Sequence, residues 1–463
     1  MAYIAAIMSG VVWGSGQALN KQFGKAIFFF SFQVLLVLAE FASGTWGLLT
    51  GTAPEMHIRH AGFFSRGIWG IVTLGEVPRT SSAVQIFDHS MVLMVSGLLA
   101  MVILALFAII LIWSVRDAYK TQKQIMAFKT ESAQKHMTVI ESKEMRRLKV
   151  GTSGSYFRGV LENSFEYIAI TPGMILVLIF SLVPILFSAI VAFTNYNTNN
   201  IPPRFLVDWT GFQTFLDIVR LPIWGRTFIG VFQWTVIWAF LATFTAYTMG
   251  FIQAIILKSK RVLHAKVWRG LYILPWAIPA MISMLIFRNL LTQAGPINRM
   301  LLDIGFISQA LPFLSDAAWA RATLVLVNIW LGFPYFMALI SGIMTTVNQE
   351  MYEAASIDGA NAWQQLRKLT VPTVLSSTAP LIILSITHNF NNFGIVFFVT
   401  AGGPHNPSYT VAGSTDILIS WIYKLTLDQR MYNFAAAMSI LIFIIIAAVA
   451  GWNLTRTRAF KED

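Results

Sequence analysis

The stretch that decides the fold is Glu350-Met351-Tyr352-Glu353-Ala354-Ala355-Ser356-Ile357-Asp358-Gly359-Ala360, a polar segment between two apolar runs. Its Glu-Ala-Ala run favours helix, and Asp358-Gly359 is a turn signal. Apolar residues then recur with helical spacing at Trp363, Leu366 and Leu369 until Pro372. The pattern predicts a helix, a tight turn and a second, short helix that Pro372 ends.

The composition around this segment is that of a membrane protein. Of 463 residues, 56% are hydrophobic and only 12% are charged. The apolar residues form runs of about 20 or more, long enough to cross a bilayer core of roughly 30 Å as helix. An all-α polytopic protein with about eight membrane helices is predicted, at Ala26–Leu49, Met91–Trp113, Ile168–Phe193, Phe228–Leu257, Gly270–Phe287, Ala322–Met344, Val374–Val399 and Phe434–Leu454.

The distribution of positive charge predicts the orientation. With the N-terminus inside, the inner segments carry 22 Lys and Arg against 11 outside, which satisfies the positive-inside rule. Both termini and the 350–372 segment are therefore expected in the cytoplasm, and the net charge of +12 needs no nucleic-acid partner. Residues 1–19 lack the basic start of a signal peptide, so the first membrane helix is expected to remain. Absence of cysteine excludes disulfides and thiol chemistry.

Four regions are expected along the chain. They are a cytoplasmic lead-in (1–25), two membrane helices with an external loop and a basic connector (26–167), a core of six membrane helices (168–455) and a cytoplasmic tail (456–463). The connector, 114–167, is predicted to be a solvated helical segment, with contact to anionic lipid as a secondary role. Prolines at 172 and 184 should kink the third membrane helix, and those at 275 and 279 should break the fifth. Glu40 is open to two interpretations, a functional carboxylate or a helix-end group reaching water.

Polar residues form one face on each of the two membrane helices that flank the 350–372 loop. Asn328, Leu331, Gly332 and Tyr335 share a face of the sixth helix, and Ser385, His388, Asn389 and Asn392 share a face of the seventh. Unpaired amides and hydroxyls in lipid cost a few kcal/mol each, so both faces are expected to look inward. Hydrogen bonds between helices are one explanation of these residues.

A neutral, polyhydroxylated ligand is the other explanation. Amides and hydroxyls suit sugar hydroxyls, and Tyr335 offers an aromatic face to a sugar ring. Neither set contains a carboxylate, Lys or Arg, which counts against amino acids, phosphate or metal ions as cargo.

The 350–372 segment resembles the coupling loop of permease subunits in ATP-binding-cassette importers. Glu-Ala-Ala, three residues, Gly359, nine residues, Leu369, one residue and Val371-Pro372 follow that family's spacing, with Leu and Val replacing the more usual Ile and Leu. The resemblance implies that this loop sits in a cleft of an ATPase subunit and passes its motion to the membrane helices. The residues implied in coupling are Glu353, Ala354, Ala355, Asp358, Gly359 and Pro372.

From about 268 to 458 the chain resembles the larger permease subunit of maltose and maltodextrin importers. The resemblance is carried by Val327–Tyr335, Asn389–Phe393, Gly402-Gly403-Pro404, Val411–Gly413 and Thr415-Asp416. It implies a type I importer permease fold in a bacterial inner membrane, and a sugar held midway across by the eight residues of the two polar faces. The implied partners are a second permease in a heterodimer, two ATPase subunits that bind ATP and Mg²⁺, an extracytoplasmic sugar-binding protein and an oligosaccharide.

Two features depart from the family. His388 stands where the family member compared has Phe, which bears on the length or identity of the sugar. The external loop 194–227 is short where the enteric protein has a folded domain, so docking of the binding protein must rest on smaller loops.

Two other functions remain open. The sequence holds no Gly-x4-Gly-Lys-Ser/Thr phosphate loop, so the chain is expected to be neither an ATPase nor any other enzyme. A proton-driven sugar transporter could use His388 or Glu40 as a relay. A membrane enzyme acting on lipid-linked sugars would need clustered carboxylates, whereas Glu40, Glu353 and Asp358 are scattered.

Overall fold

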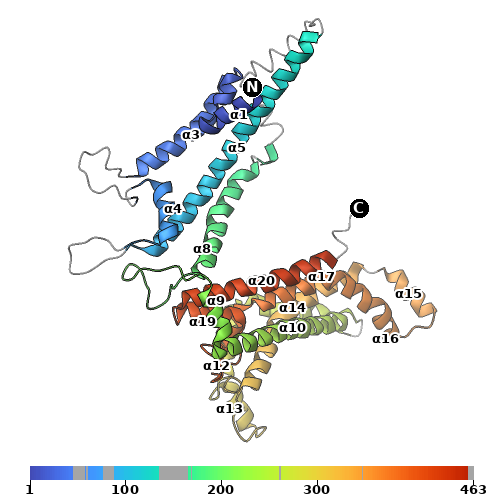
Figure 1. Ribbon diagram of the computed structural model, residues 1–463. Helices are drawn as coiled ribbons and strands as arrows, with labels where there is room; N and C mark the ends of the chain where they lie inside the picture. The colour runs from blue at the N-terminus through green and yellow to red at the C-terminus, as the bar shows by residue number, and fades with distance from the viewer. Residues whose placement is uncertain are drawn as a thin grey trace. The chain divides into compact units, whose positions relative to one another are not determined.

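The computed structural model describes residues 1–44, 58, 61–76, 88–134, 165–167, 169–259, 262–346 and 348–456, and helices dominate them (Figure 1). Six of these helices are long and apolar enough to cross a membrane, and two shorter helices bent by 90° form a seventh candidate span. The predicted all-α membrane fold is therefore confirmed. The eighth predicted span coincides with α20, Tyr432–Arg456, whose described apolar part is shorter than a span.

The chain forms two compact units, Met1–Gly211 and Phe212–Asp463. The first unit contains α1 (Ala2–Val11), α2 (Ser15–Leu19), α3 (Phe23–Ser43), α4 (Phe63–Thr73), α5 (Ser90–Gln134), a span at Phe165–Val191 that includes η2 (Leu178–Leu182), and α8 (Val183–Val191). The second contains α9 (Gln213–Arg220), α10 (Pro222–Lys258), α11 (Ala265–Ala277), α12 (Ala280–Leu290), α13 (Pro296–Asp303), α14 (Ala317–Thr346), α15 (Gln349–Ile357), α16 (Ala362–Gln365), η3 (Leu366–Thr370), α17 (Val371–Phe390), α18 (Phe393–Thr400), α19 (Leu418–Leu427) and α20. The regions proposed from sequence stay a prediction.

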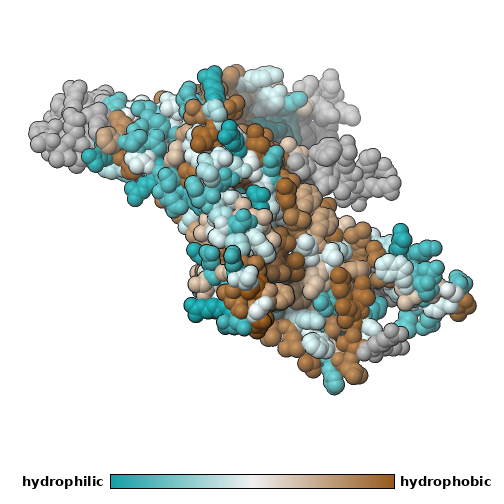
Figure 2. All heavy atoms as spheres, turned by 90° about the horizontal axis from the view of Figure 1, so that it is seen from below, coloured by the Kyte–Doolittle hydropathy of each residue, from teal (hydrophilic) through white to brown (hydrophobic). Residues whose placement is uncertain are grey.

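The surface agrees with a lipid environment. Figure 2 shows patches of hydrophobic side chains on the surface, beside hydrophilic ones. Large apolar residues such as Phe180 on the third span and Ile229 on α10 are 74% and 56% exposed. Helices that expose apolar side chains away from their own core are typical of membrane spans.

In the first unit, α1 to α4 pack along the long helix α5, which continues the second predicted span into the connector as far as Gln134. The helical connector is thus confirmed over 114–134, and the rest of it, 135–164, lies outside the described residues. Lys25 forms a largely buried ion pair with Asp117 of α5 at 3.0 Å. The amide of Gln17 donates to the Ser114 carbonyl at 2.7 Å and to Asp117 at 3.2 Å. The bond from Gln17 to Asp117 adds a hydrogen bond to the ion pair and so offsets part of the cost of burying its charges.

Glu40 has a structural role in the same unit. Its carboxylate accepts hydrogen bonds from the backbone N–H of Phe64 at 2.8 Å and of Ser65 at 3.4 Å, at the start of α4. A carboxylate at a helix N-terminus satisfies N–H groups that have no partner within the helix. Glu40 therefore caps α4 instead of only reaching water, and a functional role for its carboxylate stays a prediction.

Two prolines are accommodated by a widened helical turn. Pro184 and Pro372 each follow a valine and a five-residue π-helix, η2 and η3 respectively. In both, the N–H of the valine reaches back five residues, to Leu178 or Leu366. The prediction that Pro372 ends the second coupling helix is therefore wrong: the helix runs on from Ala362 to Phe390. Pro372 lies just after the π-turn, where the hydrogen-bond register widens and the missing proline N–H is tolerated.

Other helices break where the backbone changes direction. The fifth predicted span is broken as expected, with α11 ending at Ala277 and α12 starting after Pro279. The prediction of one continuous helix over Val374–Val399 is wrong only in its continuity, because α17 ends at Phe390 and α18 begins at Phe393. Asn391 and Asn392 occupy the break, and asparagine favours helix ends because its side chain competes for backbone hydrogen bonds.

The core of the second unit is built on α10, which packs against α14 and α17. Its buried tryptophans Trp234 and Trp238 donate to the carbonyls of Thr415 and Asn389, both at 3.1 Å. Beyond α18, Asp416 is fully buried and accepts from the Gly413 N–H at 2.7 Å, and from the Ser420 hydroxyl and the Lys424 ammonium. The Gly-Gly-Pro and Thr-Asp motifs noted in the sequence thus fold into one loop that holds α18 against α19.

Candidate functional site

A cavity of about 530 Å³ lies among the helices of the second unit, and all eight residues of the two predicted polar faces line it. The residues come from α14 (Asn328, Leu331, Gly332 and Tyr335), from α17 (Ser385, His388 and Asn389) and from the break after α17 (Asn392). The structure therefore brings together what the helical spacing placed on two separate faces. Whether these residues bind a substrate stays a prediction.

Part of this set holds the helices together. The Asn328 amide donates to the Ala242 carbonyl of α10 at 2.9 Å, and the Asn389 amide donates to the Thr243 hydroxyl at 2.9 Å. Both asparagines are more than nine-tenths buried. Their amide N–H groups therefore form the interhelical bonds that were the alternative explanation of the polar faces.

The remaining polar groups are open to the cavity. His388 is exposed and Ser385 is half-buried, and neither side chain has a hydrogen-bond partner among the described residues. The Asn392 amide makes a long bond of 3.4 Å to Asn389. Such donors and acceptors cost little while the cavity holds water and can bond an incoming hydroxylated ligand.

Two aromatic rings form one wall. Tyr335 of α14 stacks on Trp276 of α11, with ring centroids 5.9 Å apart and an interplanar angle of 26°. Both rings line the cavity and are exposed in this chain, Trp276 at 56% and Tyr335 at 37%. Stacked rings present a flat apolar surface next to the hydrogen-bonding groups of α17.

Close helix packing shapes the cavity where α14 meets α10. A Cβ added at Gly332 would lie 3.1 Å from the Cβ of Ala246 on α10. A larger residue at 332 would therefore press on α10 and fill part of the cavity.

Sequence reasoning missed the residues that other elements contribute. Trp276, Ala280 and Met284 line the cavity from the broken pair α11 and α12, and Ile395 lines it from α18. The proline pair at 275 and 279 was recognised as a break, but helical spacing within one segment does not indicate what a different segment brings to the same cavity. Trp276 lies between these prolines, which is the signal that could have found it.

The cavity has no charged wall. Among the described residues that line it there is no Asp, Glu, Lys or Arg. The described part of the chain also contains no group of three or more His, Asp or Glu residues placed to hold a metal ion. The chemistry offered is hydrogen bonding and ring stacking.

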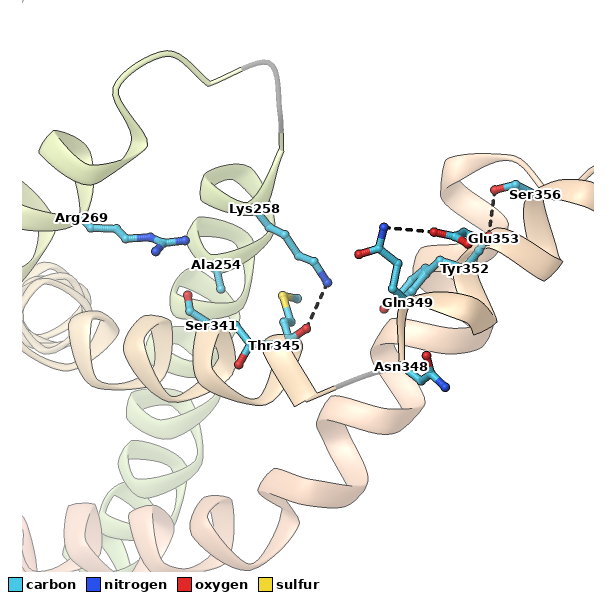
Figure 3. Close-up of a pocket in the computed structure, with 11 residues that line it drawn as sticks. Ala254, Lys258, Arg269, Ser341, Thr345, Asn348, Gln349, Tyr352, Glu353 and Ser356 are labelled. Atoms are coloured by element: carbon cyan, nitrogen blue, oxygen red, sulfur yellow. Dashed lines mark hydrogen bonds between the residues drawn. The ribbon is translucent and has the colours of Figure 1, made fainter.

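The second candidate region is the helical elbow formed by α15 and α16, drawn in part in Figure 3. Asn348 caps α15 by accepting from the Glu350 N–H at 3.0 Å, and Asn361 forms a capping box with Gln364 at the start of α16. Between them, Gly359 has φ of +79°, a conformation that glycine adopts without strain. The predicted helix, tight turn and helix are therefore confirmed.

Side-chain bonds fix the elbow to the membrane helix. The Gln365 amide donates to the Ser356 hydroxyl at 2.8 Å, and the Tyr352 hydroxyl lies 3.0 Å from that of Thr370. Because η3 joins α16 to α17 without a break, residues 362–390 form one rod of 29 residues. The elbow is at one end of this rod, and His388 and Asn389 line the cavity at the other.

The elbow presents its predicted coupling residues on the surface. Glu353, Ala354, Asp358, Gly359 and Pro372 are exposed, and Ala355 is half-buried. Two large apolar side chains beside them are strongly exposed, Ile357 at 87% and Trp363 at 67%. The exposed surface of the elbow therefore carries large apolar side chains as well as polar ones.

Comparisons with known proteins agree with this arrangement. Residues 246–458 match the family described as binding-protein-dependent transport system inner membrane component. The chain is 35% identical over 460 residues to the galactooligosaccharides transport system permease protein GanP of Bacillus subtilis, covering 99% of this chain and 98% of that protein. It is 32% identical over 469 residues to the maltodextrin transport system permease protein MalC of Streptococcus pneumoniae (strain TIGR4), covering 99% and 97%.

A solved structure supports the fold. A chain in the crystal structure of a bacterial ABC transporter involved in the import of the acidic polysaccharide alginate superposes with a TM-score of 0.54, covering 66% of this chain and 100% of that one at 21% identity. Together, the near full-length sequence match, the type I permease fold, the cavity and the elbow show that this chain belongs to the permease family of ATP-binding-cassette sugar importers, multi-pass inner-membrane subunits that transport sugar while a partner ATPase hydrolyses ATP.

Proposed function

We propose that the chain imports a neutral oligosaccharide of the maltodextrin or galactooligosaccharide class through the cavity between α11, α14 and α17. The observation that carries this proposal is the composition of the cavity wall, which offers amide, imidazole and hydroxyl groups beside a stacked Tyr335–Trp276 pair. None of its described lining residues is Asp, Glu, Lys or Arg. Sugar hydroxyls bond to the polar groups, and the C–H face of a pyranose packs on the rings. Each such hydrogen bond contributes about 0.5–1.5 kcal/mol, so several are needed to select a ligand.

The named substrates of the relatives support the same class. One relative is named for galactooligosaccharides and another for maltodextrin, both neutral sugars. The solved alginate transporter is named for an acidic polysaccharide, but its identity of 21% makes it a guide to fold alone. An acidic sugar would require a cationic partner that this cavity wall lacks.

Transport is driven, on this proposal, by two ATPase subunits that bind ATP and Mg²⁺ and receive the elbow in a surface cleft. Glu353, Asp358 and Gly359 lie on the surface that would enter the cleft, with Ile357 and Trp363 as apolar anchors. Closure of the ATPases would push on α16, and the unbroken rod to Phe390 would deliver that push to the cavity.

The remaining partners follow from the same arrangement. A second permease subunit would complete the cavity as a heterodimer, since Trp276 and Tyr335 remain exposed in the single chain. An extracytoplasmic sugar-binding protein would deliver the oligosaccharide at the end opposite the elbow. Both termini would lie in the cytoplasm, the orientation that the excess of Lys and Arg on the inner segments favours.

A proton-driven transporter is the second candidate. It rests on His388, whose imidazole is exposed and without a partner among the described residues. Its other candidate relay, Glu40, is engaged in capping α4, which leaves His388 as a single group with no relay partner in the cavity wall. The ATP-driven function is therefore favoured.

The substrate class is tested by sugar-stimulated ATPase activity of the assembled complex with its binding protein. A panel of maltodextrins, galactooligosaccharides and uronic-acid oligosaccharides is compared at equal concentration. Stimulation by one neutral series is expected. Stimulation by the acidic series alone would contradict the proposal.

A further inference from the structure

A second cavity, of about 680 Å³, lies where the elbow meets the core helices (Figure 3). Lys258 at the end of α10 and Arg269 of α11 line it on one side, and Gln349, Tyr352 and Glu353 of α15 line it on the other. Its volume falls within the range of about 300–1,000 Å³ that small-molecule sites occupy. The cavity is separate from the transport cavity, with which it shares no lining residue.

The charges in this cavity are unbalanced. Arg269 has no hydrogen bond or ion pair with any described residue, and its guanidinium points toward Ala254 and the cavity in Figure 3. Lys258 donates to the Met344 carbonyl at 3.2 Å and lies 5.0 Å from the ring centroid of Tyr352, which leaves ammonium donors available. Glu353 is the one carboxylate among the described lining residues, and it already accepts from Gln349 at 3.2 Å.

The cavity lies at the ends of two candidate membrane spans. Lys258 is the last residue of the span Pro222–Lys258, and Thr345 is the last of the span Ala317–Thr345. Both ends lie on the side that carries the excess of Lys and Arg, which the proposed orientation places in the cytoplasm. Lipid phosphates lie at this depth, and basic pockets between membrane helices on the cytoplasmic side suit anionic headgroups.

We propose that this cavity binds the phosphate of an anionic phospholipid headgroup from the cytoplasmic leaflet. Arg269 would hold the phosphate through parallel N–H groups, a geometry that a planar guanidinium matches, and Lys258 would add a point charge. The hydroxyl of Ser341, which makes no hydrogen bond with a described residue, also lines the cavity. The lipid would thereby bridge α10 and α11 to the coupling helix α15, and its presence would tune how firmly the elbow is held.

The proposal rests on the cytoplasmic orientation but not on the sugar, so its test measures lipid directly. The assembled complex is purified in nanodiscs of phosphatidylcholine with added phosphatidylglycerol, and bound lipids are counted by native mass spectrometry. Arg269→Gln is compared with wild type. Arg288→Gln is the matched control, because Arg288 is also exposed and belongs to the other half of the same broken span.

Wild type and Arg288→Gln are expected to bind phosphatidylglycerol about fivefold more tightly than Arg269→Gln. One basic side chain near an anionic lipid surface changes the binding affinity by about this factor. Equal retention by all three proteins would overturn the proposal. A second arm adds inorganic phosphate to phosphatidylcholine nanodiscs. If phosphate alone occupies the site and displaces phosphatidylglycerol, the ligand is a soluble phosphate and the lipid assignment is wrong. Loss of the ATPase from Arg269→Gln with lipid retention unchanged would assign the cavity to a carboxylate of that partner instead.

Discussion

The hydroxyls of Tyr352 on α15 and Thr370 at the foot of α17 lie 3.0 Å apart, and this bond ties the elbow to the helix that lines the transport cavity. Without it, α15 would be joined to the rod through the short α16 and the Gln365 contacts.

The first prediction concerns this tie. Tyr352→Phe and Thr370→Val should each cost about 1 kcal/mol of local stability, the usual contribution of one hydrogen bond. Sugar-stimulated ATPase activity should fall while the basal activity and the assembly of the complex persist. The double variant should cost no more than either single one, since both changes remove the same bond. Fully additive losses would show that the two hydroxyls act separately.

The second prediction concerns the aromatic wall. Trp276→Ala should raise the sugar concentration needed for half-maximal transport about two- to tenfold, since an aromatic pair is worth about 0.5–1.5 kcal/mol beyond its buried area. Trp276→Phe should recover most of this loss. The control is Trp268→Ala, on the same helix and similarly exposed but outside the cavity lining. A matching loss in the control would mean that α11, rather than the ring, is affected.

The third prediction separates neighbouring residues of α17. Asn389→Ala should lower the free energy of unfolding by about 1–3 kcal/mol, because it leaves the buried hydroxyl of Thr243 without this hydrogen-bond partner. His388→Phe should leave stability unchanged, since His388 is exposed, and should alter which chain lengths of sugar are transported. Melting curves and uptake of a sugar-length series measure the two effects. Destabilisation by His388→Phe would place the imidazole in the packing of the helices.

The fourth prediction concerns the buried pair Asp416 and Lys424. Burial raises the pKa of the Asp416 carboxyl, and Lys424 opposes that rise. Lys424→Met should cost about 3–5 kcal/mol, as removal of one partner of a buried pair does. In this variant the pKa of Asp416 rises further, because the ammonium that opposed the rise is gone. The folded chain then keeps the Asp416 proton to higher pH than the unfolded chain does. The free energy of unfolding therefore falls as the pH rises through the pKa of Asp416 in the folded chain.

The matching control is the double variant Asp416→Asn with Lys424→Met. It has no carboxyl to ionise, so its stability should not fall over that pH range. Unfolding measured across pH compares the two proteins. Identical pH profiles would show that Asp416 is not the group responsible.

The fifth prediction concerns the turn of the elbow. Gly359→Ala places a side chain at φ of +79°, which costs roughly 1–2 kcal/mol in the left-handed region. Retention of the ATPase on the complex should weaken while insertion into the membrane persists. Gly342→Ala in α14 is the control, since a Cβ there meets nothing within 4 Å. Unchanged retention in Gly359→Ala would contradict the role of the turn in coupling.

The sequence predicts this fold well where the signal is local. Apolar runs locate the spans, the Glu-Ala-Ala and Asp-Gly signals locate the elbow, and helical spacing selects the eight residues that share the cavity. These features depend on contacts between residues that are near in the chain, which a single sequence records.

Features that depend on distant segments were not predicted. Trp276 reaches the cavity because α11 ends at a 90° break, and no spacing within α14 or α17 reveals it. The π-turn beside Pro372 is a local feature that was missed for another reason: proline usually ends a helix, and nothing in the residues Leu366–Thr370 signals a turn that carries the helix past it. The capping role of Glu40 could not be predicted either, because its hydrogen-bond partners are backbone N–H groups of α4, a later segment of the chain.

The central claim is that a neutral oligosaccharide crosses through this chain at the expense of ATP. The most direct test is uptake of labelled maltodextrin or galactooligosaccharide into proteoliposomes that contain the whole complex. Uptake is measured with an uncoupler, and separately without ATP. The account predicts uptake that persists with the uncoupler and stops without ATP. Uptake that stops with the uncoupler and persists without ATP would contradict it and favour a proton-driven transporter.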